Sequence, residues 1–237
     1  MYNGHSISVV MPAYNEQENI YNIVKEFKAL NIVDEILVID NNSTDDTAQL
    51  AKDAGAVLIG EIKQGFGYAC QKGLKTAQGE YILLVEPDGT FVARDIFKFL
   101  SYIEDFSLVQ GTRTAKEMIW RGANMGHLLK WGNWFVAKIL QVLYRGPSLT
   151  DMGCTYRLIK KRALDDIKDC LSVGGSAFLA EMTIWALKKE VKTIEISVNY
   201  LSRKGVSKIT GSKWRTVVVC FKMFFIIVTR LFKKNKL

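Results

Sequence analysis

Short, largely apolar runs alternate with helical patterns through the first half of the chain. The runs at residues 7–11, 35–40 and 81–85 are each followed by a cluster of polar and acidic side chains. Unbroken apolar runs of this length are typical of strands covered on both faces, and their alternation with helices is typical of a parallel sheet. With 237 residues and 49% hydrophobic side chains, the chain can build one sizeable core. We therefore expect an α/β fold with a mainly parallel central sheet flanked by helices.

Capping residues predict where the first helices begin. Asn15 is placed to cap a helix over residues 16–30, and Ser43 or Thr44 to cap a helix that ends near residue 54. The other elements expected in this half are a strand at 56–60 and a helix at 68–76.

The carboxyl ends of the expected strands carry the candidate site. Ligands of such sheets bind at this edge. Glu86 and Asp88 place two carboxylates on one short loop, and two such ligands, completed by substrate phosphates and water, are a usual way to hold Mg²⁺ or Mn²⁺. A solvated turn is the alternative, because Pro-Asp-Gly is a strong turn signal.

Two further segments could contact a nucleotide. At Asp40–Thr47 a carboxylate and amides could bind a nucleobase edge or a ribose; an ordinary helix cap would explain Ser43 but not Asp40, which precedes it. Gly65 and Gly67 precede a helical pattern and would let a phosphate or sugar approach closely. The segment is not a dinucleotide fingerprint, because Cys70 stands where the third glycine belongs.

The net charge of +8 is concentrated toward the end of the sequence. After Glu195 there is no acidic residue, whereas basic residues recur from Arg203 onward. Such a block binds anions: nucleic acid, anionic lipid head groups or a phosphorylated substrate. We rank nucleic acid last, because the sequence contains no recognised nucleic-acid-binding module.

The cysteines and the N-terminal residues indicate a cytosolic compartment. Four cysteines without a C-x-x-C pair argue against a zinc site or a disulfide framework, so we expect reduced thiols. The first residues lack a basic region followed by an apolar one, so we expect no signal peptide.

Two later segments are amphipathic. One helix is expected over residues 120–145, with a polar face formed by His127, Lys130, Lys138, Gln141 and Arg145. The segment 214–237 is apolar and basic; Lys222 near its middle favours a helix in the membrane interface, and a spanning or re-entrant helix stays open. Its apolar side chains could instead pack against the first helix or in an oligomer. We therefore divide the chain into a domain at 1–213 and a membrane-associated helix at 214–237.

The order of these motifs is more specific than any one of them. The motifs are V-V-M-P-A-Y-N-E (Val9–Glu16), D-N-N-S-T-D-D-T (Asp40–Thr47), G-F-G-Y-A (Gly65–Ala69), E-P-D-G (Glu86–Gly89), G-T-R (Gly111–Arg113), D-M-G-C-T-Y-R (Asp151–Arg157) and R-K-G-V-S-K (Arg203–Lys208). In this order the sequence resembles the family 2 glycosyltransferases, and among them the dolichyl- or polyprenyl-phosphate sugar synthases. The last two motifs carry the resemblance to enzymes with a lipid-phosphate acceptor.

The resemblance implies a GT-A fold, a nucleotide-diphosphate sugar donor and Mg²⁺ or Mn²⁺. Glu86 and Asp88 would hold the metal, and the catalytic residues would be Asp88, Asp151 and Arg203. The residues carried over as nucleotide-sugar-binding are Pro12, Tyr14, Glu16, Asp40, Asn42, Gly65, Gly67, Glu86, Asp88, Arg113, Arg203 and Lys208. Glu86 replaces the first aspartate of the family's D-x-D, and Asn41 replaces the second aspartate of its D-D-G-S. The second departure leaves the nucleotide base open, with UDP preferred and GDP possible.

The resemblance implies inverting transfer of a sugar to a polyprenyl phosphate at the cytosolic face of a membrane. A phosphate monoester has a second pKa near 6, so this acceptor is largely ionised at pH 7 and needs cations more than a base. Transfer to a sugar or protein hydroxyl is an alternative and needs a carboxylate base, with Asp151 or the apparently buried Glu181 as candidates. A non-catalytic membrane-surface scaffold of the same fold is another. An oligomer is possible.

Overall fold

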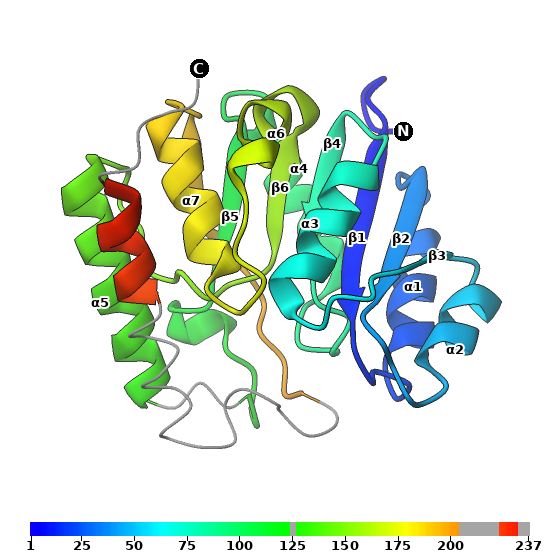
Figure 1. Cartoon of the computed structure of the whole chain (residues 1–237). Coiled ribbons are helices and arrows are strands. Elements are labelled where there is room, and N and C mark those ends of the chain that lie inside the picture. Colours follow the sequence, from blue (N-terminus) through cyan, green and yellow to red (C-terminus); the bar gives the residue numbers. More distant parts are fainter. Residues whose placement is uncertain (124–126, 204–222, 232–237) are drawn as a thin grey trace.

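A seven-stranded mixed sheet forms the centre of the molecule in this computed structural model, which describes residues 1–123, 127–203 and 223–231 (Figure 1). The strand order is β3-β2-β1-β4-β6-β5-β7. The strands are β1 (Ile7–Ala13), β2 (Glu35–Asp40), β3 (Val57–Gly60), β4 (Tyr81–Leu84), β5 (Leu108–Thr112), β6 (Arg157–Lys160) and β7 (Thr193–Ser197).

All strands but β6 run in one direction. β1 pairs in parallel with β2 and β4, β2 with β3, and β5 with β7, whereas β6 is antiparallel to both β4 and β5. Six strands therefore end at the lower edge of the sheet in Figure 1, and β6 begins there. The expected α/β fold with a mainly parallel sheet is confirmed.

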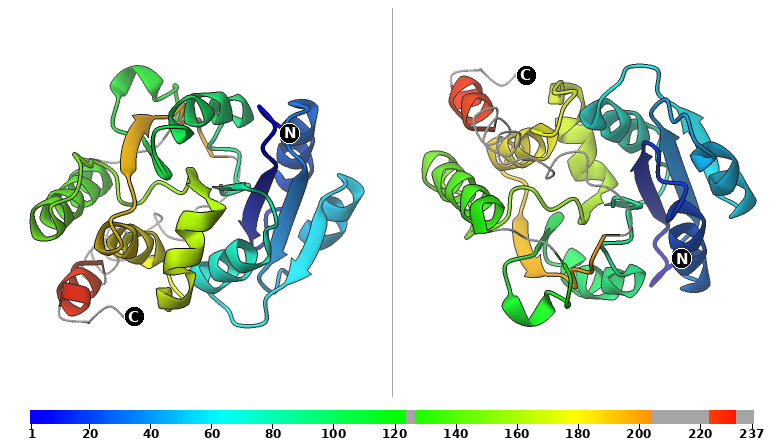
Figure 2. Two further views of the ribbon diagram at one scale, coloured as in Figure 1. Left: turned by 90° about the horizontal axis from the view of Figure 1, so that it is seen from above. Right: turned by 90° about the horizontal axis from the view of Figure 1, so that it is seen from below.

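Helices cover both faces of the sheet (Figure 2). Side chains of α1, α2 and α4 share one apolar core with the sheet, and those of α3, α6 and α7 share a second core on the other face. The helices are α1 (Ile20–Ala29), α2 (Thr47–Asp53), α3 (Phe66–Thr76), α4 (Ile96–Ile103), α5 (His127–Tyr144), α6 (Lys161–Ile167) and α7 (Phe178–Lys188), with short 3₁₀ turns η1 (Ala93–Asp95), η2 (Lys116–Met118) and η3 (Lys168–Cys170).

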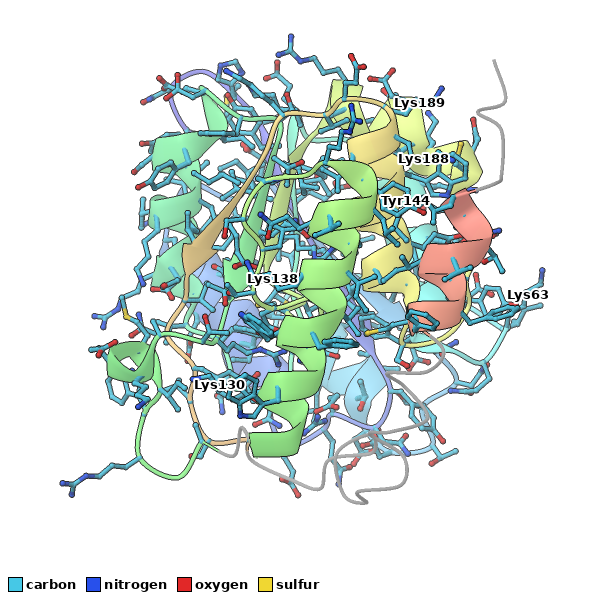
Figure 3. The ribbon with its side chains drawn as sticks, turned by 90° about the vertical axis from the view of Figure 1, so that its left-hand side faces the viewer. Lys63, Lys130, Lys138, Tyr144, Lys188 and Lys189 are labelled. Carbon is cyan, nitrogen blue, oxygen red and sulfur yellow. The ribbon has the colours of Figure 1, made fainter. Side chains whose placement is uncertain are left out.

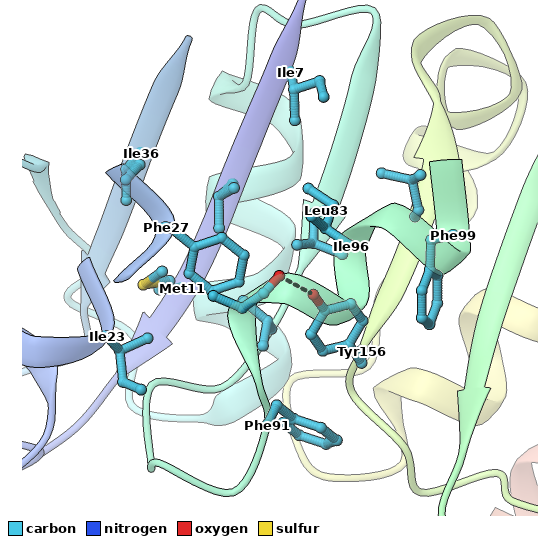
Figure 4. Packing of buried hydrophobic residues seen from close by; sticks show 14 of the residues in the cluster. Ile7, Met11, Ile23, Phe27, Ile36, Leu83, Phe91, Ile96, Phe99 and Tyr156 are labelled. Carbon is cyan, nitrogen blue, oxygen red and sulfur yellow. Dashed lines mark hydrogen bonds between the residues drawn. The ribbon is translucent and has the colours of Figure 1, made fainter. Parts of the chain in front are cut away.

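Close packing fixes these layers on the sheet. A Cβ atom at Gly73 of α3 would lie 2.3 Å from Val10 Cγ1, so the missing side chain lets α3 approach the sheet. On the opposite face Phe99 and Tyr156 pack with ring centroids 4.8 Å apart, and the Tyr156 hydroxyl donates to the Ala93 carbonyl over 3.2 Å (Figure 4). A buried hydroxyl needs such a partner.

A third layer lies outside α7. Residues 223–231 form a helix beside α5, and both pack on the outer side of α7 (Figures 1 and 3). Met223 and Ile227 are buried, and the Tyr144 hydroxyl donates to the Ile227 carbonyl over 2.7 Å. This part of the C-terminal segment thus packs beside α5, one of the arrangements that the sequence leaves open. Within the described ranges no helix is both long and apolar enough to cross a bilayer.

The expected helix caps are wrong. α1 begins at Ile20 and α2 at Thr47, several residues later than predicted from Asn15 and Ser43. The Asn15 side chain accepts from Thr44 N over 2.8 Å, and Ser43 Oγ accepts from Asn15 N over 3.0 Å. These side chains join two loops to each other, so they do not cap their own helices.

The helix expected over 120–145 begins later, at His127. Gly122 has a left-handed backbone, with φ +86°, which interrupts a helix. Trp120 instead lies against the segment after β7, where its indole Nε1 donates to Asn199 Oδ1 over 3.1 Å. α3 begins at Phe66, two residues earlier than predicted, and so includes Gly67.

Candidate functional site

The candidate site lies at the edge where six strands end and β6 begins. The topology brings to it the loops after β1, β2, β4, β5 and β7 and the loop before β6. Pro12 lies within β1, Asp40 is the last residue of β2, and Arg113 directly follows β5. Residues far apart in the sequence thus meet here because parallel strands share their carboxyl edge.

The loops after β1 and β2 are locked together. Besides the bonds between Asn15 and residues 43–44, Glu16 N donates to Thr47 Oγ1 over 2.7 Å. Asp40 Oδ1 accepts from Ser43 N over 3.1 Å, which turns the chain after β2. Asn15 and Asn42 have left-handed backbones, with φ +53° and +63°, which asparagine tolerates well. Tyr14, Glu16, Asp40 and Asn42 are therefore held at one rim of the edge.

Asn41 organises the glycine-rich loop before α3. Its buried amide donates to the carbonyls of Glu61 (2.9 Å) and Lys63 (2.8 Å). Its Oδ1 accepts from Gly65 N over 2.7 Å and from the Gln64 side chain over 3.3 Å. An aspartate could not donate to the two carbonyls. The departure at Asn41 therefore has a local structural purpose, which the sequence pattern does not reveal.

Gly65 and Gly67 lie against a second loop, at residues 172–175. A Cβ atom at Gly65 would lie 2.3 Å from the Gly174 carbonyl oxygen, and one at Gly67 would lie 2.1 Å from the Val173 carbonyl oxygen. Gly67 N donates to Gly174 O over 2.8 Å. Both glycines are thus required by close backbone contact with another loop.

Glu86 and Asp88 form an acidic pair after β4. Asp88 is buried, and its Oδ1 accepts from Thr90 N (3.0 Å) and Thr90 Oγ1 (2.6 Å). Burial and the charge of Asp88 raise the pKa of Glu86 to about 7, although a hydrogen bond from Thr155 and the charges of Arg203 and Arg113 oppose this rise. Two carboxylates that repel each other in this way are suited to bind a divalent cation. In the described part of the chain no three His, Cys, Asp or Glu side chains cluster as ligands, so this pair would need oxygens from substrate or water.

Arg203 neutralises part of this acidic edge. Its Nη2 lies 2.6 Å from Glu16 Oε1, and its Nη1 lies 3.2 Å from Asp88 Oδ2. The guanidinium therefore links the loops after β1 and β4 to the segment after β7. The catalytic candidates Asp88 and Arg203 are in direct contact.

Arg113 and Asp151 form a separate buried pair. Arg113 Nε and Nη2 donate to the two Asp151 oxygens over 2.8 and 3.0 Å. Burial opposes ionisation of Asp151, but the charge and hydrogen bonds of Arg113 outweigh it and lower the pKa of Asp151. Glu195 on β7 accepts from Thr150 N and Asp151 N and holds the segment. Asp151 is therefore a firmly ionised carboxylate with an arginine partner.

The structure thus brings the predicted residues to one edge, with one exception. Lys208 lies outside the described residues. The supporting residues that the sequence reasoning missed are Asn41, Thr90, Thr155 and Glu195. Of these, only Asn41 and Thr155 lie within the family motifs, at Asp40–Thr47 and Asp151–Arg157, so their positions could have indicated a role at the site. Among the described residues Cys70 and Cys154 are free and buried, and Cys170 is free.

The mixed sheet with carboxylates at its carboxyl edge has the arrangement expected of a GT-A fold. The chain belongs to glycosyltransferase family 2: the sequence model described as "Glycosyl transferase family 2" matches residues 8–168. Glycosyltransferase AglJ of Haloferax volcanii is 28% identical over 84% of this chain and 64% of its own length. The low-salt glycan biosynthesis hexosyltransferase Agl6 of the same organism is 29% identical over 90% of this chain and 52% of its own. The chain thus spans between about half and two thirds of these relatives.

Solved structures agree with the fold. Glucosyl-3-phosphoglycerate synthase from Mycobacterium tuberculosis, in complex with phosphoglyceric acid, superposes with a TM-score of 0.77 at 16% identity, covering 98% of this chain and 82% of that chain. The same enzyme with Mn²⁺, UDP and phosphoglyceric acid gives 0.76 at 16% identity, covering 98% and 81%. At these identities the likeness concerns the fold alone.

Proposed function

We propose that this protein is an inverting, metal-dependent hexosyltransferase that moves one sugar from a nucleotide-diphosphate sugar to a polyprenyl phosphate. UDP is the preferred nucleotide and GDP the second. Support for the donor and metal comes from the structural relative, which was solved with Mn²⁺ or Mg²⁺ and UDP. Support for a hexose comes from the relative named a hexosyltransferase.

Glu86 and Asp88 would hold Mg²⁺ or Mn²⁺. Burial and the nearby charge of Asp88 raise the pKa of Glu86, and a divalent cation held between the two carboxylates would relieve their repulsion. When bound, the metal would neutralise charge that develops on the leaving nucleoside diphosphate. Thr90 and Thr155 keep the two carboxylates in place.

The joined loops after β1 and β2 would bind the nucleoside, through Pro12, Tyr14, Glu16, Asp40 and Asn42. The glycine-rich loop, with Gly65 and Gly67, would bind the diphosphate and sugar. Rigid loops of this kind hold a reactant in position without an entropic cost at the moment of reaction.

Arg203 and Lys208 would position the acceptor phosphate and the leaving group. The reaction is an in-line displacement at the anomeric carbon, in which a phosphate oxygen forms the new bond while the nucleoside diphosphate leaves. Since the acceptor is already ionised near pH 7, no residue needs to remove a proton. Asp151 would not serve as a base, because Arg113 pairs with both of its oxygens and lowers its pKa. Its place is to orient Arg113 at the edge of the site.

An exposed apolar face beside the site carries the proposal of a lipid acceptor. We use the term "apolar face" for the exposed large apolar side chains of α5 and of the helix at 223–231, which are Trp131, Trp134, Phe135, Val142, Leu143, Phe224 and Phe225. Trp131, Phe135 and Val142 are 64%, 60% and 76% exposed. Surface groups of large apolar side chains mark contact with lipid or protein.

Lys130 of α5 contacts the protein, because its Nζ donates to Thr114 O over 3.1 Å (Figure 3). Lys138 Nζ donates to Gln141 Oε1 on the same helix over 2.9 Å. Asn133, also on α5, is buried beside Gly153, close to the Arg113–Asp151 pair. The same helix therefore borders the candidate site and exposes aromatic rings. With the net charge of +8, this favours a peripheral or C-terminally anchored position on an anionic, cytosolic membrane face.

Lipid-extractable product tests the proposal. Purified protein is incubated with Mn²⁺ or Mg²⁺, radiolabelled UDP- or GDP-sugars and a polyprenyl phosphate in detergent, and the organic phase is counted. We expect label in that phase with one donor, and none with Asp88→Asn, whose neutral amide is a poorer ligand for a hard cation. Label on an added sugar or protein hydroxyl would favour the hydroxyl-acceptor alternative. Absence of transfer together with absence of coupled nucleotide and metal binding would favour the scaffold.

A further inference from the structure

A buried ion pair connects the helix at 223–231 to α7. Arg230 Nη2 and Nε lie 2.7 and 3.1 Å from Glu181 Oε1. The Glu181 side chain is completely buried, whereas that of Arg230 is 18% exposed. Lys188 Nζ donates to the Arg230 carbonyl over 2.7 Å and fixes the register of this helix on α7. A buried carboxylate requires such a partner.

The same carboxylate holds the start of the 172–175 loop. Glu181 Oε2 accepts from Ser172 N and from Val173 N, each over 2.8 Å. Ser172 Oγ donates to Glu181 Oε1 over 3.0 Å and lies 2.8 Å from Arg230 Nη2. Glu181 is therefore the junction between the helix at 223–231 and this loop.

The 172–175 loop in turn supports the glycine-rich loop. Gly67 N donates to Gly174 O over 2.8 Å, and Gln71 Nε2 donates to Val173 O over 3.0 Å. The backbone contact at Gly65 leaves no room for a Cβ atom. A displacement of residues 173–174 must therefore move the segment that contains both glycines.

We propose that Glu181 and Arg230 are positioning residues for nucleotide-sugar binding. Through this ion pair, the position of the helix at 223–231 determines the position of the 172–175 loop. The loop in turn determines the backbone position of Gly65 and Gly67. The inference deepens the proposed function, since it assigns those glycines to the donor. Without Arg230 the buried Glu181 carboxylate loses its counter-ion, so the cluster that it forms with Ser172 and Val173 is destabilised.

Neutral variants of the pair test this coupling. We expect Arg230→Gln to raise the Kd of UDP with Mn²⁺ about tenfold, equivalent to about 1.4 kcal/mol, and Arg230→Lys to recover part of the loss. Glu181→Gln should act like Arg230→Gln, and the double variant should be no worse than either, since both remove one interaction. Ile103→Val, in the core under the opposite face of the sheet, is the control for a general loss of stability. It should lower the Tm and leave the Kd within about twofold.

Hydrogen exchange without ligand separates this inference from the proposed function. In Arg230→Gln, peptides covering residues 65–68 and 172–175 should exchange faster, whereas in Ile103→Val they should not. Faster exchange confined to residues 223–231, or an unchanged Kd, would overturn the inference. If the wild type binds neither UDP nor GDP with Mn²⁺, the proposed donor is wrong, and the exchange pattern alone decides whether the pair couples the two loops.

Discussion

At the scale of single residues, Arg203 contacts the carboxylate to which the proposed metal ion would bind. Its guanidinium contacts Asp88 and Glu16 directly. A divalent cation that binds Asp88 must displace one of these contacts or bring a second positive charge close to it. Arg203 therefore neutralises part of the acidic edge and would oppose binding of the proposed metal there.

This arrangement predicts the behaviour of an Arg203→Gln variant. Its affinity for Mn²⁺ alone should rise about tenfold, or about 1.4 kcal/mol, because a cation that repels the metal is gone. Its turnover should fall, because the same charge positions phosphates in the proposed reaction. Titration of free Mn²⁺ by electron paramagnetic resonance measures the first effect. Arg203→Lys keeps the charge and should bind Mn²⁺ like the wild type; equal affinities in all three proteins would contradict the prediction.

The raised pKa of Glu86 predicts a pH dependence. The unfolded chain has the usual value of 4.5, whereas the folded protein has about 7. Native Glu86 thus holds a proton that the unfolded chain loses between these pH values, and its contribution to stability is fully present below pH 4.5 and is lost as pH rises through 7. Without metal, we expect Glu86→Gln to gain Tm over the wild type from pH 5 to pH 8. Glu104→Gln, an exposed change far from the site, should show no such trend, and a constant difference for Glu86→Gln would refute the shift.

At the scale of elements, the four strands predicted in the first half lie close to their expected positions, whereas the helix starts were wrong and no range was predicted for β5, β6 or β7. Apolar runs indicate strands because burial on both faces demands them, and β2 matches its run at 35–40. The caps at Asn15 and Ser43 failed because these side chains bond across to the neighbouring loop, which no local pattern encodes. The reversed direction of β6 was likewise absent from the sequence pattern.

The candidate site was predictable to the extent that motifs mark strand ends. Glu86, Asp88 and Asp40 lie where the sequence places them, because the carboxyl edge follows from the strand pattern. The pairing of Arg113 with Asp151 joins residues 38 positions apart, and that of Glu181 with Arg230 joins residues 49 apart. Such partners depend on the tertiary fold, so only the burial of Glu181 could be anticipated.

The proposed membrane contact predicts what removal of the exposed aromatic rings of α5 should do. The double substitution Trp131→Ser and Phe135→Ser should reduce co-sedimentation with vesicles containing anionic lipid at least tenfold, because each buried side chain of this size contributes about 1.5–3 kcal/mol. Tm and UDP binding should be unchanged, since both rings are exposed. Tyr102→Ser, on the outside of α4, is the matched control and should bind vesicles like the wild type. Equal sedimentation of all variants would exclude α5 as the contact.

At the scale of the whole molecule, one buried cation joins the sheet to the layers outside it. Arg157 on β6 is completely buried and donates to the carbonyls of Cys154 (3.0 Å), Met152 (3.1 Å) and Leu179 (2.8 Å), and to Thr183 Oγ1 (2.9 Å). Burial lowers its pKa to about 10. Among the described residues it has no carboxylate within ion-pair distance. Its hydrogen bonds connect β6, the turn before it and α7.

Removal of this cation should destabilise the entire fold. Arg157→Met leaves buried carbonyl groups without donors, and we expect a loss of about 3 kcal/mol in the free energy of unfolding. Urea denaturation followed by circular dichroism measures it, and the transition should stay single because the apolar cores pack on one continuous sheet. Arg162→Met, an exposed change on α6, should cost less than about 0.5 kcal/mol. Comparable midpoints for the two variants would contradict this assignment.

The contact of Arg203 with Glu16 also has a kinetic consequence. It closes a loop of chain between residues 187 positions apart. Closing so long a loop carries an entropic cost that only the surrounding packed structure can repay, and contacts of this separation slow folding. Helices and the strands of the first half can therefore form while the edge of the sheet is still open. A chain in which β7 and the segment after it have not joined the sheet therefore lacks the contacts of Arg203 with Glu16 and Asp88.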